Sequence, residues 1–424
     1  MTRQRRVAVV GGGWAGISAA VAATERGHAV QMFEMAPQLG GRARSVDIDG
    51  IEVDNGQHIG IGAYTETLAL MRRIGVDPAA AFLRTPLRLI DASGVGLSLR
   101  PGPPALAFAA AVLRHPGWRW SDKLGLLAAA ARWTAQGFRC DPAWTVGALT
   151  AGLAPAVRAT LIAPLCVAAL NTEAHEASGA VFLRVLKDAL FAGPGASDLL
   201  LPRWPLGRVL PLPALAWLRR QRAQVHLGRR VQRIEARAGG WHVDDEEVDA
   251  VVLAATAVEA SRLTAELAPE WSRSAAGLAQ EPIVTCYLRS AGARLRSPML
   301  TLESGADAPA QFVFDRGQLG GPPGLLAFVV SGARAWVERG SAATWDAVER
   351  QARAALDAQL AGPLQRLKAI TEQRATFRCV PALVRPVQQI APGLYAAADF
   401  VDGPYPATLE GAVRSGLDAI ARLT

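Results

Sequence analysis

The chain has 424 residues, half of them hydrophobic, and one hydrophobic core seldom supports that length, so we expect two domains. Its net charge of +8 comes almost entirely from arginines scattered along the sequence, so a clustered basic surface for nucleic acid is not expected. No apolar run reaches the ~20 residues of a membrane-spanning helix, the first residues do not resemble a secretory signal, and the four cysteines form no C-x-x-C pair; we expect a cytoplasmic protein without a metal site.

The first predicted elements form a dinucleotide-binding unit. Arg6–Val10 predicts a short buried strand that leads directly into a G-x-G-x-x-G turn, Gly11-Gly12-Gly13-Trp14-Ala15-Gly16. An alanine-rich helix follows and ends at Gly27, and Ala29–Glu34 predicts a second strand. Strand, turn, helix, strand and terminal acid therefore occur in order, which disfavours a glycine turn that serves packing alone.

Each residue of the turn has a physical task. Gly11 permits the tight bend, Gly13 lets the backbone approach a pyrophosphate, and Gly16 allows helix and strand to pack closely. Trp14 and Ala15 lie at the helix N-terminus, whose backbone N–H groups face the phosphates. The turn therefore predicts a dinucleotide cofactor.

Glu34 and the residues after it indicate which cofactor is bound. A carboxylate at the end of the second strand accepts hydrogen bonds from the ribose hydroxyls, and its charge disfavours the 2′-phosphate of NADP. Gly41 and Arg42, in the turn Leu39–Ser45, offer a backbone N–H and a guanidinium to a second stretch of pyrophosphate or ribityl chain. A plain surface turn is the alternative, but the fixed distance from Glu34 favours FAD over NAD.

The middle of the chain predicts hairpins at 84–100, helices over 101–200, and strands near 282–289, 310–315 and 325–331. Within residues 101–138, aromatic and basic side chains flank short apolar helices, a pattern that suits a helix resting in a lipid headgroup layer. These side chains are Trp118, Trp120, Trp133 and Phe138 beside Arg114, Arg119, Lys123 and Arg132. A helix pair buried in the core is the alternative.

Several segments carry a resemblance to a known family: residues 7–45, the D-x-G-x-H-like segment Val53–Ile59, residues 225–235, and residues 393–416. Together they resemble the flavin-containing amine oxidase and phytoene desaturase superfamily. The resemblance implies an α/β fold, in which a Rossmann-type (GR2-like) FAD-binding domain is interwoven with an α+β substrate domain. We expect the FAD domain at 1–80, 205–280 and 380–424, and the substrate domain at 81–204 and 281–379, with a helical lid at 101–200.

The resemblance also implies that FAD is held without a covalent bond. Gly56, Gln57 and His58 come from the segment that lies near the flavin ring in this superfamily. Val231 would contact the adenine side of the cofactor through its backbone.

The C-terminal motif reads as a strand, an acid and a helix N-terminus. Asp399 would meet the ribityl hydroxyls. Thr408 caps the helix, and the backbone N–H groups around Leu409 and Glu410 stabilise the negative charge that develops when a flavin is reduced.

The branch of the superfamily is indicated by two residues that amine oxidases have near the flavin and that this chain lacks. No lysine occurs between Lys187 and Lys368, and Thr408 stands where an aromatic cage residue is expected. Leu165–Asn171 and Leu200–Leu212 resemble segments of plant-type phytoene desaturases and squalene-associated flavoenzymes. This implies a long-chain isoprenoid substrate collected at a membrane surface, and reductive dehydroxylation of hydroxysqualene in squalene and hopanoid synthesis.

Alternatives remain open at this point. They are a carotenoid-type desaturase and, less favoured, an amine oxidase or a non-enzymatic escort of prenylated proteins. Dehydroxylation requires an acid that protonates the leaving hydroxyl, and His58 leads Asp54 and Tyr405 as the candidate because its motif lies near the flavin. A lone histidine is more often structural. No second G-x-G-x-x-G occurs, so an external electron donor of unknown identity is expected.

Overall fold

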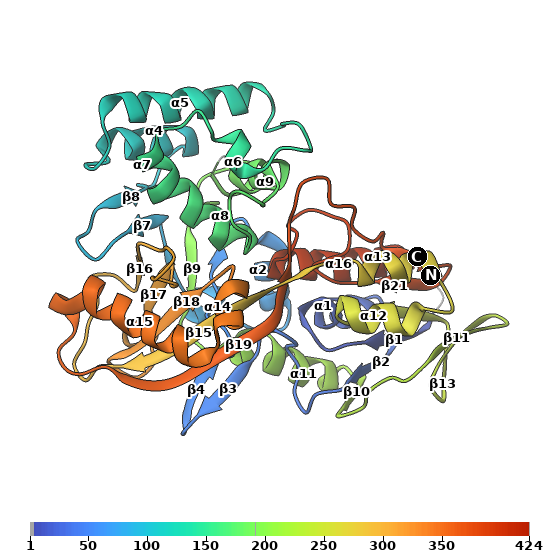
Figure 1. Cartoon of the computed structure of the whole chain (residues 1–424). Coiled ribbons are helices and arrows are strands. Elements are labelled where there is room, and N and C mark those ends of the chain that lie inside the picture. Colours follow the sequence, from blue (N-terminus) through green and yellow to red (C-terminus); the bar gives the residue numbers. More distant parts are fainter. Residues whose placement is uncertain (1–3, 191, 424) are drawn as a thin grey trace.

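The structure, a computed structural model, describes residues 4–190 and 192–423, and Figure 1 shows two parts between which the chain crosses repeatedly. The first part is built on a six-stranded sheet with the strand order β10-β2-β1-β14-β21-β20. Neighbouring strands pair in parallel except β20, which runs antiparallel to β21. The strands are β1 (Arg6–Val10), β2 (Ala29–Glu34), β10 (Gln224–Leu227), β14 (Ala250–Leu253), β20 (Gln389–Ala391) and β21 (Leu394–Ala396).

Helices cover this sheet, and a small β-meander extends from its edge (Figure 1). The first and last helices cross very closely, because Ser18 Oγ donates to the carbonyl of Val413 at 2.9 Å and a Cβ on Gly416 would lie 2.2 Å from the carbonyl oxygen of Ala15. The elements are α1 (Trp14–Glu25), α11 (Pro211–Arg220), α12 (Ala257–Thr264), α13 (Pro269–Ala276), α16 (Leu409–Ala421), β11 (Ile234–Arg237), β12 (Gly240–Val243) and β13 (Glu246–Val248).

This arrangement confirms the predicted α/β fold class, and β1 and β2 have the predicted bounds. The strands of the sheet come from three separate stretches of the chain, and each stretch lies inside one of the three ranges expected for the FAD domain. The division of the chain into domains itself stays a prediction.

The second part is built on a five-stranded antiparallel sheet with the order β16-β17-β18-β15-β19. It confirms the strands expected near 282–289, 310–315 and 325–331, whereas the long strand β19 was not predicted. The elements are β15 (Gln280–Arg289), β16 (Met299–Thr301), β17 (Phe312–Asp315), η2 (Arg316–Leu319), β18 (Leu325–Val330), α14 (Arg334–Arg339), α15 (Ser341–Leu356), η3 (Asp357–Gln359) and β19 (Gln365–Phe377).

Several short elements lie within residues 45–98 and 199–209. Strand β9 pairs with both β5 and β6, and it is buried along its whole length. The short elements are β3 (Ser45–Ile48), β4 (Ile51–Asp54), β5 (Gly60–Ile61), α2 (Thr65–Arg73), α3 (Pro78–Ala81), β6 (Phe82–Thr85), β7 (Arg88–Ile90), β8 (Gly96–Ser98), β9 (Leu199–Pro202) and α10 (Leu206–Val209).

The stretch expected as a lid is helical up to Leu190, and Figure 1 shows it above the five-stranded sheet. A π-helical turn precedes Pro164 in an otherwise continuous helix. Proline lacks the N–H group that an α-helix needs, so the wider turn accommodates it. The helices are α4 (Pro104–Arg114), α5 (Trp120–Ala135), α6 (Val146–Leu149), α7 (Pro155–Val157), η1 (Arg158–Ile162), α8 (Ala163–Leu170) and α9 (Gly179–Leu190).

The aromatic residues of the lid divide between the two environments that the sequence left open. Trp118 is 6 % exposed, stacks on His115 with 3.8 Å between the ring centroids, and donates to Thr160 at 3.1 Å. Trp133 is buried as well, whereas Trp120 is 66 % exposed. Lys123 is also buried, since its Nζ donates to the carbonyl of Leu113 at 2.9 Å. Among the described helices, none is long and apolar enough to cross a membrane.

Candidate active site

The glycine turn has the geometry that its sequence predicts. Gly11 has a φ of +109°, and a Cβ there would lie 2.3 Å from the carbonyl oxygen of Ala254. A Cβ on Gly16 would lie 1.9 Å from the carbonyl oxygen of Gly11, so both positions require glycine. A Cβ on Gly13 would meet no protein atom within 4 Å. The turn therefore leaves open space where a pyrophosphate would approach the N-terminus of α1.

Glu34 is held beside this turn. Its Oε2 accepts from the N–H of Gly12 at 2.6 Å, and its Oε1 accepts from the N–H of Ala36 at 2.7 Å. Strand β10 pairs with β2 and places the segment after it next to Glu34, because the N–H of Arg229 donates to the Glu34 carbonyl at 2.9 Å. Val231 follows in this segment and is buried. The two residues predicted at the adenosine end thus lie on neighbouring segments.

Arg42 and Asp399 form an ion pair. Burial acts to lower the pKa of Arg42, but the charge of Asp399 and the hydrogen bond to it outweigh burial and raise this pKa. Both residues line a cavity. Gly41 lies beside the glycine turn, because a Cβ on it would be 3.1 Å from the Cα of Gly13.

The sequence did not indicate the other residues of this cavity. They come from the N-terminus of α12, from β15 and β19, and from the C-terminal motif, and they are Thr256, Ala257, Val258, Gln280, Arg374, Phe377 and Phe400.

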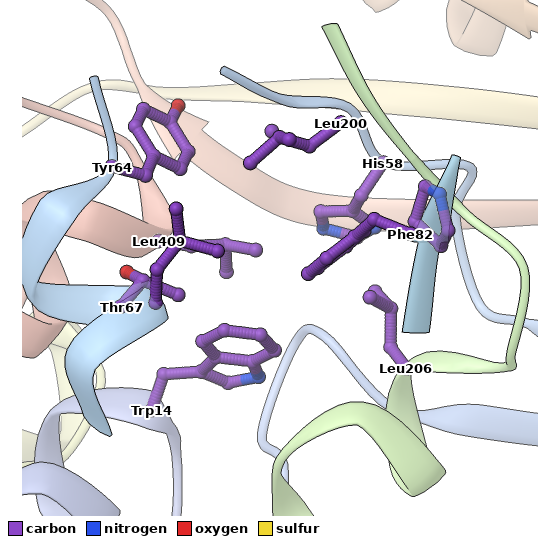
Figure 2. Close-up of a pocket in the computed structure, with 11 residues that line it drawn as sticks. Trp14, His58, Tyr64, Thr67, Phe82, Leu200, Leu206 and Leu409 are labelled. Atoms are coloured by element: carbon purple, nitrogen blue, oxygen red, sulfur yellow. The ribbon is translucent and has the colours of Figure 1, made fainter. Parts of the chain in front are cut away.

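A second pocket lies where the predicted flavin motifs meet (Figure 2). Trp14 of the glycine turn, His58 and Leu409 at the N-terminus of α16 all line it. The surface that faces the pocket is entirely apolar. The remaining lining residues were not predicted as site residues, although three of them, Leu200, Pro202 and Leu206, come from the segment Leu200–Leu212 that carries the resemblance. The others are Gly60, Tyr64, Thr67, Leu68 and Phe82. We call it the apolar pocket.

His58 is neutral in this environment. Burial lowers its pKa, the hydrogen bond with Gly56 opposes this, and the charge of Arg42 lowers the pKa further. Its Nδ1 lies 2.6 Å from the carbonyl oxygen of Gly56, so Nδ1 carries the hydrogen and Nε2 is left as an acceptor. The neighbouring Gln57 is buried, and its side chain donates to the carbonyl of His58 at 3.1 Å.

Asp54 lies behind the pocket wall. Its Oδ1 accepts from the N–H of Leu206, a lining residue, at 2.6 Å, and its backbone carbonyl accepts from the hydroxyl of Tyr287 at 2.7 Å. Burial raises the pKa of Asp54 to about 7, although the hydrogen bond from Leu206 and the charge of Arg316 act to lower it. A large fraction of Asp54 is therefore protonated near neutral pH.

Tyr405 does not line the pocket but contacts a residue that does. Its ring meets the lining residue Tyr64 edge to face, with 6.5 Å between the centroids. Tyr405 has a φ of +60° and Ala407 a φ of +57°, which are left-handed conformations that side chains rarely adopt. The turn is held by Thr408, whose Oγ1 donates to the Tyr405 carbonyl at 2.7 Å.

The C-terminal motif confirms one expectation and adds a contact. Thr408 caps α16, since its Oγ1 accepts from the N–H of Gly411 at 3.0 Å. Glu410 is fully buried, and its carboxylate reaches across to the N-terminus of α2, where it accepts from the N–H groups of Glu66 and Thr67 at 3.0 and 2.9 Å. The N-termini of α2 and α16 are thereby joined beside the pocket. Spacing in the sequence does not indicate this long-range contact.

Comparison with known proteins places the chain in a family. Residues 14–424 match the family model described as flavin containing amine oxidoreductase. Hydroxysqualene dehydroxylase of Rhodopseudomonas palustris is 28% identical, and the match covers 97% of this chain and 96% of that protein. Zeta-carotene desaturase of Zea mays is 38% identical over 17% of this chain and 13% of its own.

The fold has known counterparts too. An oxidoreductase from Methanosarcina mazei superposes with a TM-score of 0.72 at 16% identity, over 98% of this chain and 100% of that one. At this identity the likeness concerns the fold alone. The expected resemblance to squalene-associated flavoenzymes is confirmed by the dehydroxylase relative. Because the family model spans nearly the whole sequence, the chain belongs to the flavin-containing amine oxidoreductase family.

Proposed function

We propose that the chain binds FAD without a covalent bond and reductively removes the allylic hydroxyl of hydroxysqualene to give squalene. The observation that carries the proposal is the apolar pocket, which lies where Trp14, His58 and Leu409 meet. The carbon surface of this pocket suits an isoprenoid. The dehydroxylase relative supports the same substrate class.

The described residues fit FAD. The open space at Gly13 and the N-terminus of α1 suit a pyrophosphate. Glu34 lies where a ribose would be held, and the cavity with Arg42 and Asp399 suits the ribityl stretch. When bound and reduced, the flavin supplies a hydride.

The protein residues have two tasks in this reaction. The apolar walls exclude water, so that charge developing on the substrate meets no competing nucleophile. A side chain must also protonate the leaving hydroxyl. His58 lines the pocket, whereas Asp54, whose pKa burial raises to about 7, lies behind its wall, so His58 stays the first candidate proton source and Asp54 and Tyr405 follow it.

The test is a single turnover without oxygen. Chemically reduced enzyme mixed with hydroxysqualene is expected to form squalene as its flavin reoxidises, with about one product per flavin. His58→Ala is expected to slow product formation by ~10²–10⁴-fold while flavin content is retained. Asp54→Asn in parallel compares the two candidate proton sources. A flavin that stays reduced in the wild type would refute the dehydroxylation.

The second candidate is a carotenoid-type desaturase. The stretch shared with zeta-carotene desaturase favours it, although that stretch covers only 17% of the chain. Oxidised enzyme would then introduce double bonds into a polyene. Product analysis with oxidised and with reduced enzyme separates the two reactions.

We further propose that helices α4 and α5 rest on a membrane surface, from which the substrate is collected. Leu106, Leu113, Trp120 and Leu124 of these helices are between 40 % and 68 % exposed, and we call them the interfacial face. Exposed arginines such as Arg119 flank it. Apolar and basic side chains together suit the headgroup layer of an anionic bilayer.

A further inference from the structure

Residues 229–233, which follow β10, form a loop beside the predicted ribose position, and we call them the adenosine loop. At its start, the N–H of Arg229 donates to the carbonyl of Glu34 at 2.9 Å. Because Glu34 lies where the ribose is expected, the base attached to that ribose reaches this loop. The loop contains no helix or strand residue, so its shape depends on hydrogen bonds to other elements.

Two consecutive peptide groups of the adenosine loop are each held at both ends. Arg262 of α12 donates from Nη2 to the carbonyl of Val231 at 2.8 Å and from Nη1 to the carbonyl of Gln232 at 2.9 Å. At the opposite end of the same peptide groups, Oδ1 of Asp244 accepts from the N–H groups of Gln232 and Arg233, both at 2.9 Å. Neither peptide group can rotate without breaking hydrogen bonds at both of its ends.

Glu259 holds the guanidinium of Arg262 in this orientation. Its carboxylate accepts from Nε and Nη2 of Arg262 at 3.1 and 2.7 Å, and from Nε and Nη2 of Arg230 at 3.1 and 3.0 Å. The hydrogen bond from Arg262 is the largest of the effects that lower the pKa of Glu259 to about 2, so the carboxylate stays charged near neutral pH. All three guanidinium nitrogens of Arg262 are therefore bonded, and the fork that points to the loop is fixed by the fork that points to Glu259.

One backbone donor of the loop is held in place without being used. The peptide group between Arg230 and Val231 is bonded at its carbonyl, which accepts from the side chain of Gln232 at 3.2 Å. The N–H of the same peptide group, that of Val231, has no hydrogen-bond partner among the residues that the structure describes. The residues on both sides of this N–H are fixed by the protein, so its direction is fixed as well.

We propose that Arg262 is a positioning residue for the cofactor, which fixes the adenosine loop so that the N–H of Val231 points at N1 of the adenine ring. This rests on the proposed function, in which FAD is bound. N1 of adenine accepts hydrogen bonds, so a fixed N–H donor favours adenine over a base whose N1 carries a hydrogen. The side chain of Arg262 is 38% exposed, and ion pairs at such positions contribute little to stability, so its task lies in binding and not in folding.

The experiment titrates the flavin-free full chain with FAD and with the analogue of FAD in which hypoxanthine replaces adenine. N1 of hypoxanthine carries a hydrogen and would meet the N–H of Val231 donor to donor. The wild type is therefore expected to bind FAD roughly tenfold more tightly than the analogue. In Arg262→Met this ratio is expected to fall close to one through weaker binding of FAD, while the melting temperature stays near that of the wild type.

Two further variants keep the outcome interpretable. Arg262→Lys keeps the charge but offers a point donor in place of the planar fork, so an intermediate ratio is expected. Arg273→Met removes an exposed arginine of α13 whose guanidinium donates to the Pro269 carbonyl of its own helix, and it is expected to leave the ratio unchanged.

Folded Arg262 variants that keep the wild-type ratio would overturn the inference. An equal loss of affinity for both dinucleotides would do so as well, because it would give Arg262 a structural role alone. If the wild type prefers FAD but forms no squalene from hydroxysqualene, the proposed reaction fails and the inference stands. If the wild type forms squalene but binds both dinucleotides equally, the inference fails alone.

Discussion

At the scale of single residues, one side chain can hold the backbone of the site and also be the predicted partner of the cofactor. Glu34 illustrates this, because its carboxylate holds the backbone of Gly12 at 2.6 Å while it lies where the ribose is expected. Removing it deletes the hydrogen bond that holds the turn and, under the proposed function, a hydrogen-bond partner of the ribose.

We expect Glu34→Ala to weaken FAD binding by about 1–3 kcal/mol, since charge-assisted hydrogen bonds of the carboxylate are lost. Titration of the flavin-free protein with FAD measures the change. Glu25→Ala, which removes a partly exposed carboxylate from α1, is the matched control. Unchanged affinity in Glu34→Ala would refute the ribose assignment, and so would FMN as the bound species.

Asp54 makes the free energy of unfolding depend on pH. Its pKa is about 7 in the folded protein against 3.8 for an ordinary aspartate, so between these values the folded state binds more protons than the unfolded state. Stability from this group is therefore lost as the pH rises through that window. Relative to Asp54→Asn, we expect the wild type to lose up to ~4 kcal/mol between pH 4 and pH 7. Urea unfolding at several pH values measures the difference, and parallel curves for the two proteins would contradict the shifted pKa.

At the scale of elements, the sequence indicates where helices form more reliably than which face they expose. The lid was predicted to be helical and is, yet Trp118 and Trp120 have opposite environments although only one residue separates them. Residues 101–138 contain the apolar and basic residues of an interfacial helix, but Trp118 is buried through contacts made in the folded chain, which are its stacking on His115 and its hydrogen bond to Thr160 in the π-helical turn.

We expect Trp120→Ser combined with Leu124→Ser to reduce co-sedimentation with anionic liposomes on the order of tenfold or more, because two large apolar side chains no longer enter the bilayer. The melting temperature and flavin content are expected to stay near wild type. Val384→Ser, which changes an 80 % exposed valine on another segment, serves as the control. Trp118→Ser is expected to destabilise the fold instead, by ~3–5 kcal/mol. Undiminished liposome binding of the double variant would remove the interfacial face from the proposal.

At the scale of the whole molecule, the sequence predicts local features well and distant contacts poorly. The strand, glycine turn and acid of residues 6–34 are specified by spacing alone, and the structure places them as expected. Strand β19 escaped prediction because its sequence, QRLKAITEQRATF, mixes charged and apolar residues without a clear alternation. The site is the least predictable part, since Glu410 lies 343 residues from Thr67 and the two meet only in the folded chain.

The close crossing of the first and last helices bears on how the protein is made. Ser18 and Val413 are separated by 395 residues, yet they share a hydrogen bond. A ribosome that has finished the glycine turn must still synthesise most of the chain before the opposite wall of the cofactor site exists, although N-terminal segments usually fold first. The site between α1 and α16 is therefore complete only late in synthesis, after α16 has been made.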